Sequence, residues 1–411
     1  MTQAIDTLAI DDARLIARLH ELGVTGRDGT LGLCRLAASD ADKAGRDLLC
    51  RWLAQAGLRI EIDRIGNIHG IWEPEGASGD PLVMGSHIDT VINAGIYDGC
   101  YGVLAGLSVI EALQRAGLRP SRPLAVVAYT NEEGVRYAPD MMGSLVAAGG
   151  LDVQAALASI GTDGTVLGDE LQRIGYAGPR EPGFLKPHAY VELHVEQGPV
   201  LEAERTDIGA VENLQGISWQ RVTIGGVANH AGTTPMPMRR DAGVAAARVI
   251  GFLDALARRT PGAVATVGSL RLEPDAINVI PSLASLTVDL RNPDENRLQA
   301  QEAALAAELE ALRAEGFTVA TERLARFQPV AFAPQITAMI EKAAAERQLS
   351  CRRMTSGAGH DAQMIARIAP AAMIFVPSQG GISHNPAEFT ADPDLIAGAN
   401  VLLDVAWRLS R

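Results

Sequence analysis

Three short segments in the first third of the chain combine side chains that bind divalent metal ions. They are Gly85-Ser86-His87-Ile88-Asp89-Thr90, Tyr97-Asp98-Gly99 and Thr130-Asn131-Glu132-Glu133-Gly134. Zinc, manganese and cobalt ions accept imidazole nitrogen and carboxylate oxygen, and two ions about 3.5 to 4 Å apart can share one bridging carboxylate. Several carboxylates brought to one place need such a counter-charge, so these segments predict a metal site.

The sequence around these segments predicts strands that end at the metal-binding side chains. Apolar runs at residues 81–84 and 124–129 come directly before the histidine and glutamate segments. Between the two runs, residues 102–116 carry apolar side chains at spacings that suit one buried face of a helix. In open α/β sheets, ligands bind beyond the carboxyl ends of the strands. We therefore expect both segments to face one crevice of a βαβ unit.

Two later parts of the chain repeat this arrangement. The strand-like segment 189–195 carries His194, and the apolar run 371–376 comes shortly before His384. A glycine-rich turn at residues 356–361 adds a further histidine. One histidine near one aspartate is common by chance, but several such loops in one chain favour a metal site.

The order of predicted elements changes after residue 216. Residues 217–326 predict strand, helix, strand, strand, helix and strand, which is the order of a split-βαβ, ferredoxin-like module. We place an inserted α+β domain at residues 214–329, between the two parts of an α/β catalytic domain with a mixed sheet, residues 1–213 and 330–411. The strands of the inserted domain alternate in polarity, whereas those near the metal site are continuous apolar runs, as in strands buried on both faces.

Composition limits the partners and the compartment. The 411 residues are 47% hydrophobic, enough for a sizeable core, and the formal net charge is -13 at pH 7. Nucleic acids and anionic membranes attract clustered Lys and Arg, so the charge argues against both as partners. The four cysteines are scattered without a CxxC pair. We expect reduced cysteines, neither a signal peptide nor a membrane-spanning segment, and a cytoplasmic protein.

Seven segments of the chain together resemble one branch of a known enzyme family. Besides the three segments above, they are Glu192-Leu193-His194-Val195-Glu196-Gln197-Gly198-Pro199, Ala228-Asn229-His230-Ala231-Gly232-Thr233-Thr234-Pro235-Met236, Ser356-Gly357-Ala358-Gly359-His360-Asp361-Ala362 and Gly381-Ile382-Ser383-His384-Asn385-Pro386. The set resembles the N-carbamoyl-L-amino acid hydrolase and allantoate amidohydrolase branch of the dinuclear aminoacylase and carboxypeptidase family, nearly end to end. Peptidase relatives usually carry a carboxylate where this chain has His194, which makes it similar to the amidohydrolase branch in particular.

The resemblance implies a dinuclear centre with two divalent metal ions per subunit, drawn from Zn, Mn, Co and Ni. One ion would be bound by His87, Asp98 and His194. The other would be bound by Asp98, Glu133 and His384, so that Asp98 bridges the two ions.

The resemblance also implies roles for residues around the ions. Asp89 would hydrogen-bond the second ring nitrogen of His87 and so orient the ring. Glu132 would be the general base that takes a proton from the attacking water, because successive residues of an extended chain face opposite ways and Glu133 is the ligand. His230, from the inserted domain, would polarise the substrate carbonyl, and this lid domain would also form a homodimer.

The implied substrate is a small ureido acid. Its carboxylate suits a guanidinium fork, and its ureido group suits an amide and the backbone of a glycine-rich turn. The residues expected to bind it are Gln197, Asn278, Arg291, Gly357, Gly359 and His360. We favour cleavage of the carbamoyl C–N bond of N-carbamoyl-L-amino acids, which gives an amino acid, CO2 and ammonia.

Other functions remain open at this stage. Allantoate, 3-ureidopropionate and ureidoglycolate share the ureido and carboxylate groups, and residues 93–96 depart from the Gly-Gly pair that many relatives carry. A metallo-dipeptidase or aminoacylase would use the same metal ligands with another substrate. A cysteine-dependent carbamoylase would need a nucleophile, for which Cys100 is the cysteine beside a candidate site residue.

Overall fold

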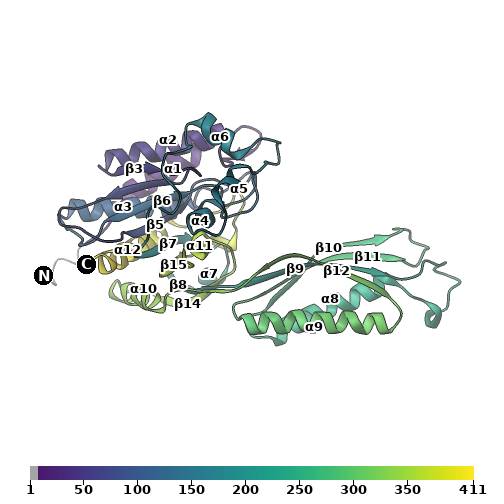
Figure 1. Ribbon diagram of the computed structural model, residues 1–411. Helices are drawn as coiled ribbons and strands as arrows, with labels where there is room; N and C mark the ends of the chain where they lie inside the picture. The colour runs from purple at the N-terminus through teal and green to yellow at the C-terminus, as the bar shows by residue number, and fades with distance from the viewer. Residues whose placement is uncertain (1–7) are drawn as a thin grey trace. The chain divides into compact units, whose positions relative to one another are not determined.

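The computed structural model describes residues 8–411, which divide into two compact units (Figure 1). The first unit contains the chain up to Glu212 and again from Ala331 to Arg411. The second unit contains Asn213–Val330 and is therefore inserted into the sequence of the first. Within residues 8–411, the helices are all too short or too polar to cross a membrane.

A nine-stranded mixed sheet forms the centre of the first unit. The strand order is β13-β8-β15-β7-β5-β6-β4-β3, and β14 also pairs with β8. The four strands β5, β6, β7 and β15 run parallel and are buried at every residue, whereas β4 and β8 continue the sheet antiparallel on either side. The strands are β3 (Arg59–Ile62), β4 (Ile68–Trp72), β5 (Leu82–His87), β6 (Leu124–Tyr129), β7 (Ala189–Val195), β8 (Ile208–Leu214), β13 (Val330–Ala331), β14 (Cys351–Ser356) and β15 (Ala371–Val376).

Helices cover both faces of this sheet. On one face, α3 packs against β5, β6 and β7, and α12 packs against α3, β7 and β15. On the other face, α4 contacts β6, and α11 contacts β5, β7 and β15. The helices are α1 (Asp12–Val24), α2 (Asp40–Gln55), α3 (Cys100–Arg115), α4 (Met142–Ala147), α5 (Val153–Leu157), α6 (Leu167–Ile174), α7 (Val200–Glu204), α10 (Pro334–Glu346), α11 (Asp361–Ile365), η3 (Gln379–Gly381) and α12 (Asp392–Leu409), and a small ribbon is made by β1 (Arg27–Asp28) and β2 (Gly32–Leu33).

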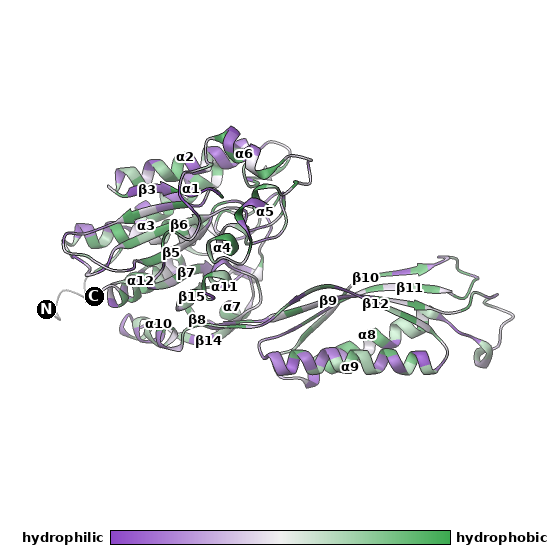
Figure 2. Ribbon diagram, viewed as in Figure 1, coloured by the Kyte–Doolittle hydropathy of each residue, from purple (hydrophilic) through white to green (hydrophobic). Residues whose placement is uncertain are grey.

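The second unit is a four-stranded antiparallel sheet with two helices. Its strand order is β10-β11-β9-β12, which is the order of a ferredoxin-like module. Both α8 and α9 pack against the sheet, and α9 carries hydrophilic residues along much of its length (Figure 2) around a buried leucine stripe. The elements are β9 (Gly216–Gly225), η2 (Met236–Met238), α8 (Ala242–Arg259), β10 (Val264–Glu273), β11 (Leu283–Asn292), α9 (Glu295–Ala314) and β12 (Thr318–Phe327).

The predicted α/β fold class with a ferredoxin-like inserted module is confirmed. The predicted strands 124–129 and 371–376 coincide with β6 and β15. The sequence pattern does not predict β8 and β14, whose residues mix polar and apolar types without a clear alternation.

Candidate metal centre

The candidate ligands meet at one edge of the large sheet because four parallel strands end there. His87 is the last residue of β5, and His194 lies one residue before the end of β7. Glu133 follows β6 by four residues, and His384 lies on the loop that follows β15. Parallel strands place their carboxyl ends at the same edge, so residues more than 290 positions apart come together.

Two groups of three side chains are close enough to bind metal ions, and they share Asp98. In the first group, Asp98 Oδ1 lies 3.4 Å from His87 Nε2 and 3.2 Å from His194 Nε2. In the second group, His384 Nε2 lies 3.3 Å from Asp98 Oδ2 and 3.4 Å from Glu133 Oε2. The two oxygens of one carboxylate thus face two different groups.

These distances fit metal coordination. For ligand bonds of about 2.0 to 2.1 Å, two ligands of a tetrahedral ion lie about 1.63 bond lengths apart, which is roughly 3.3 to 3.4 Å. The four distances above lie within 0.2 Å of this range. The donor set of imidazoles and carboxylates suits zinc, manganese, cobalt and nickel.

The ring nitrogens of His87 and His194 are oriented for metal binding. Nδ1 of His87 lies 3.0 Å from the carbonyl oxygen of Asp89, and Nδ1 of His194 lies 2.9 Å from that of Val195. A carbonyl oxygen only accepts, so Nδ1 carries the proton in each ring. In the neutral ring, Nε2 then carries the lone pair that a metal ion would use, and in His194 this atom accepts the Gly99 N–H at 3.0 Å. Gly99 allows the close approach, since a Cβ there would lie 2.4 Å from His87 Nε2.

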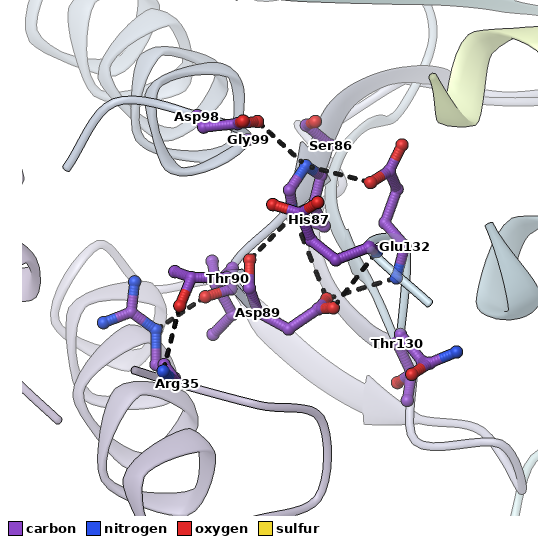
Figure 3. Close-up of polar contacts among 12 residues, drawn as sticks. Arg35, Ser86, His87, Asp89, Thr90, Asp98, Gly99, Thr130 and Glu132 are labelled. Carbon is purple, nitrogen blue, oxygen red and sulfur yellow. Dashed lines mark hydrogen bonds and ion pairs between the residues drawn. The ribbon is translucent and has the colours of Figure 1, made fainter. Parts of the chain in front are cut away.

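Asp89 orients its neighbours differently from the sequence expectation. Its carboxylate lies 3.9 Å from His87 Nδ1, and its backbone carbonyl makes the closer contact. The carboxylate instead accepts the backbone N–H group of Glu132 at 3.3 Å (Figure 3). It also accepts the backbone N–H group of Glu133 at 3.3 Å. Glu132 and Glu133 lie beyond the end of β6, so their N–H groups have no partner in the sheet, and the Asp89 carboxylate accepts both. Asp89 therefore connects the β5 loop to the loop that carries both glutamates.

The two adjacent glutamates lie on different sides of the centre. Glu132 Oε2 is 3.5 Å from His87 Nε2, whereas Glu133 Oε2 is 3.4 Å from His384 Nε2. Glu133 belongs to one of the two metal-binding groups, and Glu132 belongs to neither. Glu132 is 8% exposed and lines the cavity beside the metal-binding groups. Its position suits a base that acts beside the ions.

Neighbouring charges shift the pKa values at the centre. Burial alone would raise the pKa of Asp98, but hydrogen bonds from His194, His384 and His87 hold it well below its usual value. Burial and the charge of Asp98 raise the pKa of Glu133 to about 8. The hydrogen bond with Asp98 raises the pKa of His384 to about 9. Metal ions that bind here therefore displace protons at neutral pH.

A third group of metal-binding side chains has another role. Glu192, His194 and His360 also lie close together. Both oxygens of Glu192 are already used, because one accepts the Ser86 hydroxyl at 2.6 Å and the other accepts the Ala362 N–H at 2.8 Å. We interpret Glu192 as a buried link between β5, β7 and α11 and not as a ligand.

A cavity of about 390 Å³ is lined by all three residues of the second group, including Asp98, which the first group shares. Gln197 lies at its wall, and its Nε2 donates to Asp98 Oδ2 at 2.8 Å and to Ser383 Oγ at 3.1 Å. The Gln197 Oε1 atom is buried without a hydrogen-bond partner among the described residues. The lining residues are Asp98, Glu132, Glu133, Asp140, Met141, Gln197, Ala358, Gly359, His360, Gly381, Ser383 and His384.

The turn that begins at Gly357 is held by Ser356. The Ser356 hydroxyl donates to the Ala358 carbonyl, accepts the Ala358 N–H, and lies 3.1 Å from His360 Nε2. Gly359 and His360 thereby reach the cavity wall.

His230 and Asn278 lie together within the second unit. The segment around His230 pairs with that around Asn278, whose carbonyl accepts the Ala231 N–H. His230 Nδ1 accepts the N–H groups of Gly232 and Thr233 at 3.0 and 3.2 Å. In neutral His230 the proton therefore sits on Nε2, and the exposed ring can donate a hydrogen bond from that atom.

Arg291 is already paired within its own strand. Its guanidinium nitrogens lie 2.9 to 3.1 Å from the carboxylate of Asp289, two residues earlier on β11. Arg291 is expected from the sequence to bind the substrate carboxylate, and Asp289 on the same face of the sheet would compete with that carboxylate.

The sequence pattern does not predict two buried charged residues near the centre, Arg35 and Glu388. Arg35 is fully buried, and its guanidinium donates to the Ile88 carbonyl and to Cys100 Sγ. Glu388 is 6% exposed and accepts backbone N–H groups from the Asp98 loop. A charged residue inside an apolar segment is the signal for Arg35, whereas no local signal marks Glu388.

Comparisons with known proteins agree on one family. Residues 83–408 match peptidase family M20/M25/M40. The N-carbamoyl-L-amino-acid amidohydrolase of Rhizobium meliloti is 39% identical over 95% of this chain and 94% of its own length. The allantoate amidohydrolase of Bacillus subtilis is 34% identical over 87% of this chain and 88% of its own length. A crystal structure of an amidase of the hydantoinase/carbamoylase family from Burkholderia multivorans superposes with a TM-score of 0.95 at 42% identity, covering 98% of this chain and 99% of that one.

Proposed function

The chain belongs to peptidase family M20/M25/M40, and from this premise we propose that it is a metal-dependent amidohydrolase that cleaves the carbamoyl C–N bond of N-carbamoyl-L-amino acids. The observation that carries the proposal is the pair of metal-binding groups that share Asp98 in one cavity, with Glu132 beside them. The name of the Rhizobium meliloti relative supports the substrate class. One water is consumed, and the products are the amino acid, CO2 and ammonia.

The chain's own residues can perform most of this reaction. Two divalent ions bound here would supply positive charge that polarises the carbamoyl carbonyl and acidifies water. Glu132 takes the proton of the attacking water and can return it to the leaving amine nitrogen. His230 donates from Nε2 to the oxygen that gains negative charge. Gln197 accepts an N–H of the ureido group with Oε1, which has no other partner among the described residues.

The substrate carboxylate is assigned to Asn278 and Arg291 in this proposal. Arg291 already pairs with the Asp289 carboxylate, so the substrate carboxylate would replace Asp289 at the guanidinium group. The glycine-rich turn with Gly357, Gly359 and His360 would contact the ureido group. The carbamoyl carbonyl, the ureido N–H and the carboxylate of the substrate are then all held, which leaves one direction for the substrate's side chain. Only the L-form can therefore reach the geometry for attack.

The remaining parts of the proposal concern assembly and metals. We place the enzyme in the cytoplasm as a homodimer that forms through the second unit, with two ions per subunit. The four cysteines of this chain, Cys34, Cys50, Cys100 and Cys351, are free, which agrees with a reducing compartment.

A kinetic panel tests the function. We expect the highest kcat/KM for an N-carbamoyl-L-amino acid, no turnover of its D-form, and a higher KM or lower kcat for Arg291→Lys, because a point charge replaces a planar fork. Equal rates on both enantiomers, or an unaffected Arg291→Lys variant, would show that the carboxylate is bound elsewhere. Allantoate is the second candidate, since the Bacillus subtilis relative carries that name, and a strong preference for allantoate in the panel would select it.

A further inference from the structure

Glu388 connects two loops that carry candidate metal ligands. One of its carboxylate oxygens accepts the N–H groups of Tyr97 and Asp98, at 3.1 and 3.3 Å. The other oxygen accepts the hydroxyl of Ser383 at 3.0 Å, next to His384 in sequence. Glu388 is 6% exposed, so these hydrogen bonds form largely away from water, where an unpaired partner is costly.

The three histidines of the centre differ in how firmly their surroundings hold them. The side chains of His87 and His194 are 2% and 1% exposed, lie in strands, and bond a carbonyl through Nδ1. The side chain of His384 is 53% exposed, and its backbone lies on a loop with a left-handed φ of 52°. Packing therefore fixes His87 and His194, whereas the position of His384 depends on how its loop is attached.

The attachment forms a closed set of hydrogen bonds around Asp98. Gln197 Nε2 donates to Asp98 Oδ2 and to Ser383 Oγ, and Ser383 Oγ donates to Glu388. Glu388 in turn accepts the backbone N–H groups of Tyr97 and Asp98, which closes the set. Gly95 leaves room for this contact, since a Cβ at that position would lie 2.2 Å from Glu388 Oε2.

We propose that Glu388 is a positioning residue that sets the affinity of the second metal site, formed by Asp98, Glu133 and His384. It holds the bridging carboxylate and His384 at the separation that one ion requires. The first site depends less on Glu388, because strands β5 and β7 position two of its three ligands, His87 and His194. The inference rests on the dinuclear centre of the proposed function and concerns one of its two ions.

Glu388→Gln tests this assignment with metal binding as the readout. Gln keeps the shape, but its NH2 group cannot accept a hydrogen bond, so one of the two loops loses its acceptor. Stepwise affinities are measured by competing Zn²⁺ or Co²⁺ between the protein and a chromophoric chelator. Glu133 is a ligand of the second site only, so the metal-binding step that is lost in Glu133→Gln is the one that belongs to the second site. We expect Glu388→Gln to weaken that step by about 10- to 100-fold, the usual effect of losing a residue that orients a ligand, and to leave the other step within about twofold.

Glu196→Gln is the matched control. Glu196 is 8% exposed and also accepts two backbone N–H groups, from Val200 and Leu201, but it contacts none of the candidate ligands. We expect both steps of this variant to equal those of the wild-type protein. If Glu388→Gln does not fold, Ser383→Ala removes one donor of the same network and should weaken the same step severalfold.

Three results would overturn the inference. They are unchanged affinities in the Glu388 and Ser383 variants, equal weakening of both steps, and a wild-type protein that binds fewer than two ions. The last result would also remove the dinuclear part of the proposed function. A wild-type protein that binds two ions but hydrolyses no ureido acid would refute the substrate assignment alone.

Discussion

Replacing Glu132 with Gln separates the base from the metal ligands. Gln keeps the length of the side chain and the backbone N–H that Asp89 accepts, so the loop should stay in place. Glu132 belongs to neither metal-binding group, and its neighbour Glu133 belongs to one. The variant should therefore bind metal as the wild-type protein does and lose only the group that accepts the proton.

The expected loss of rate follows from the role of a positioned base. Removing such a base lowers turnover by about 10² to 10⁴, which corresponds to about 2.7 to 5.5 kcal/mol in the activation barrier. The upper half of this range is expected here, because Glu132 is 8% exposed and little bulk water is present to replace it. KM should change little, since Glu132 contacts His87 and not the residues assigned to the substrate.

The assay compares two adjacent carboxylates. Single-turnover and steady-state rates on an N-carbamoyl-L-amino acid are measured with metal content for Glu132→Gln and Glu133→Gln. We expect Glu132→Gln to lose turnover at full metal content, and Glu133→Gln to lose metal and turnover together. Near wild-type turnover of a fully metallated Glu132→Gln variant would refute the assignment, and so would a loss of metal equal to that of Glu133→Gln.

Two further predictions concern the metals and the assembly. Chelation should abolish activity, and Mn, Co, Ni or Zn should restore it. The pKa values of His384 and Glu133 are raised to about 9 and 8, so metal binding at pH 7 should release protons, which calorimetry in buffers of different ionisation enthalpy detects. For the same reason, metal affinity should rise between pH 7 and 9. Full activity of a metal-free protein would contradict this. Mixing His230→Ala and Glu132→Gln chains tests whether His230 acts across a twofold dimer. If it does and subunits exchange freely, half of the dimers are mixed and one of the two sites in each mixed dimer is intact. The mixture should then recover about a quarter of the wild-type activity. No recovery in proven mixed dimers would place His230 in its own subunit's site.

Much of the fold follows from local patterns in the sequence. The run 371–376 is continuously apolar and lies between turn residues, and it forms β15 at those positions. Residues 392–409 carry apolar side chains on a helical period and form α12. The pairing of β15 with β7 and β8 is different, because it joins segments about 160 to 180 residues apart. No local pattern contains that information, so the sheet order could not be predicted from periodicity.

The candidate site also contains some residues that the sequence indicates and others that it does not. His87 and His194 lie at the ends of strands, where the general rule for α/β sheets places ligands, and the sequence alone indicates them. The pairing of Arg291 with Asp289 was also visible in principle, since residues i and i+2 of a strand share one face. Glu388 gave no signal, because its partners at Tyr97 and Asp98 are backbone groups about 290 residues away.

The division between local and distant contacts suggests how the centre works as a unit. Two of the three ligands in the first group, His87 and His194, lie at strand ends, which the core of the sheet holds in place whether or not an ion is bound. The second group uses an exposed histidine on a loop, and that loop is joined to Asp98 through Ser383 and Glu388. A metal site whose ligands are held less firmly loses more freedom on binding and therefore binds more weakly. The second ion should then be the one that dissociates first on dilution or mild chelation.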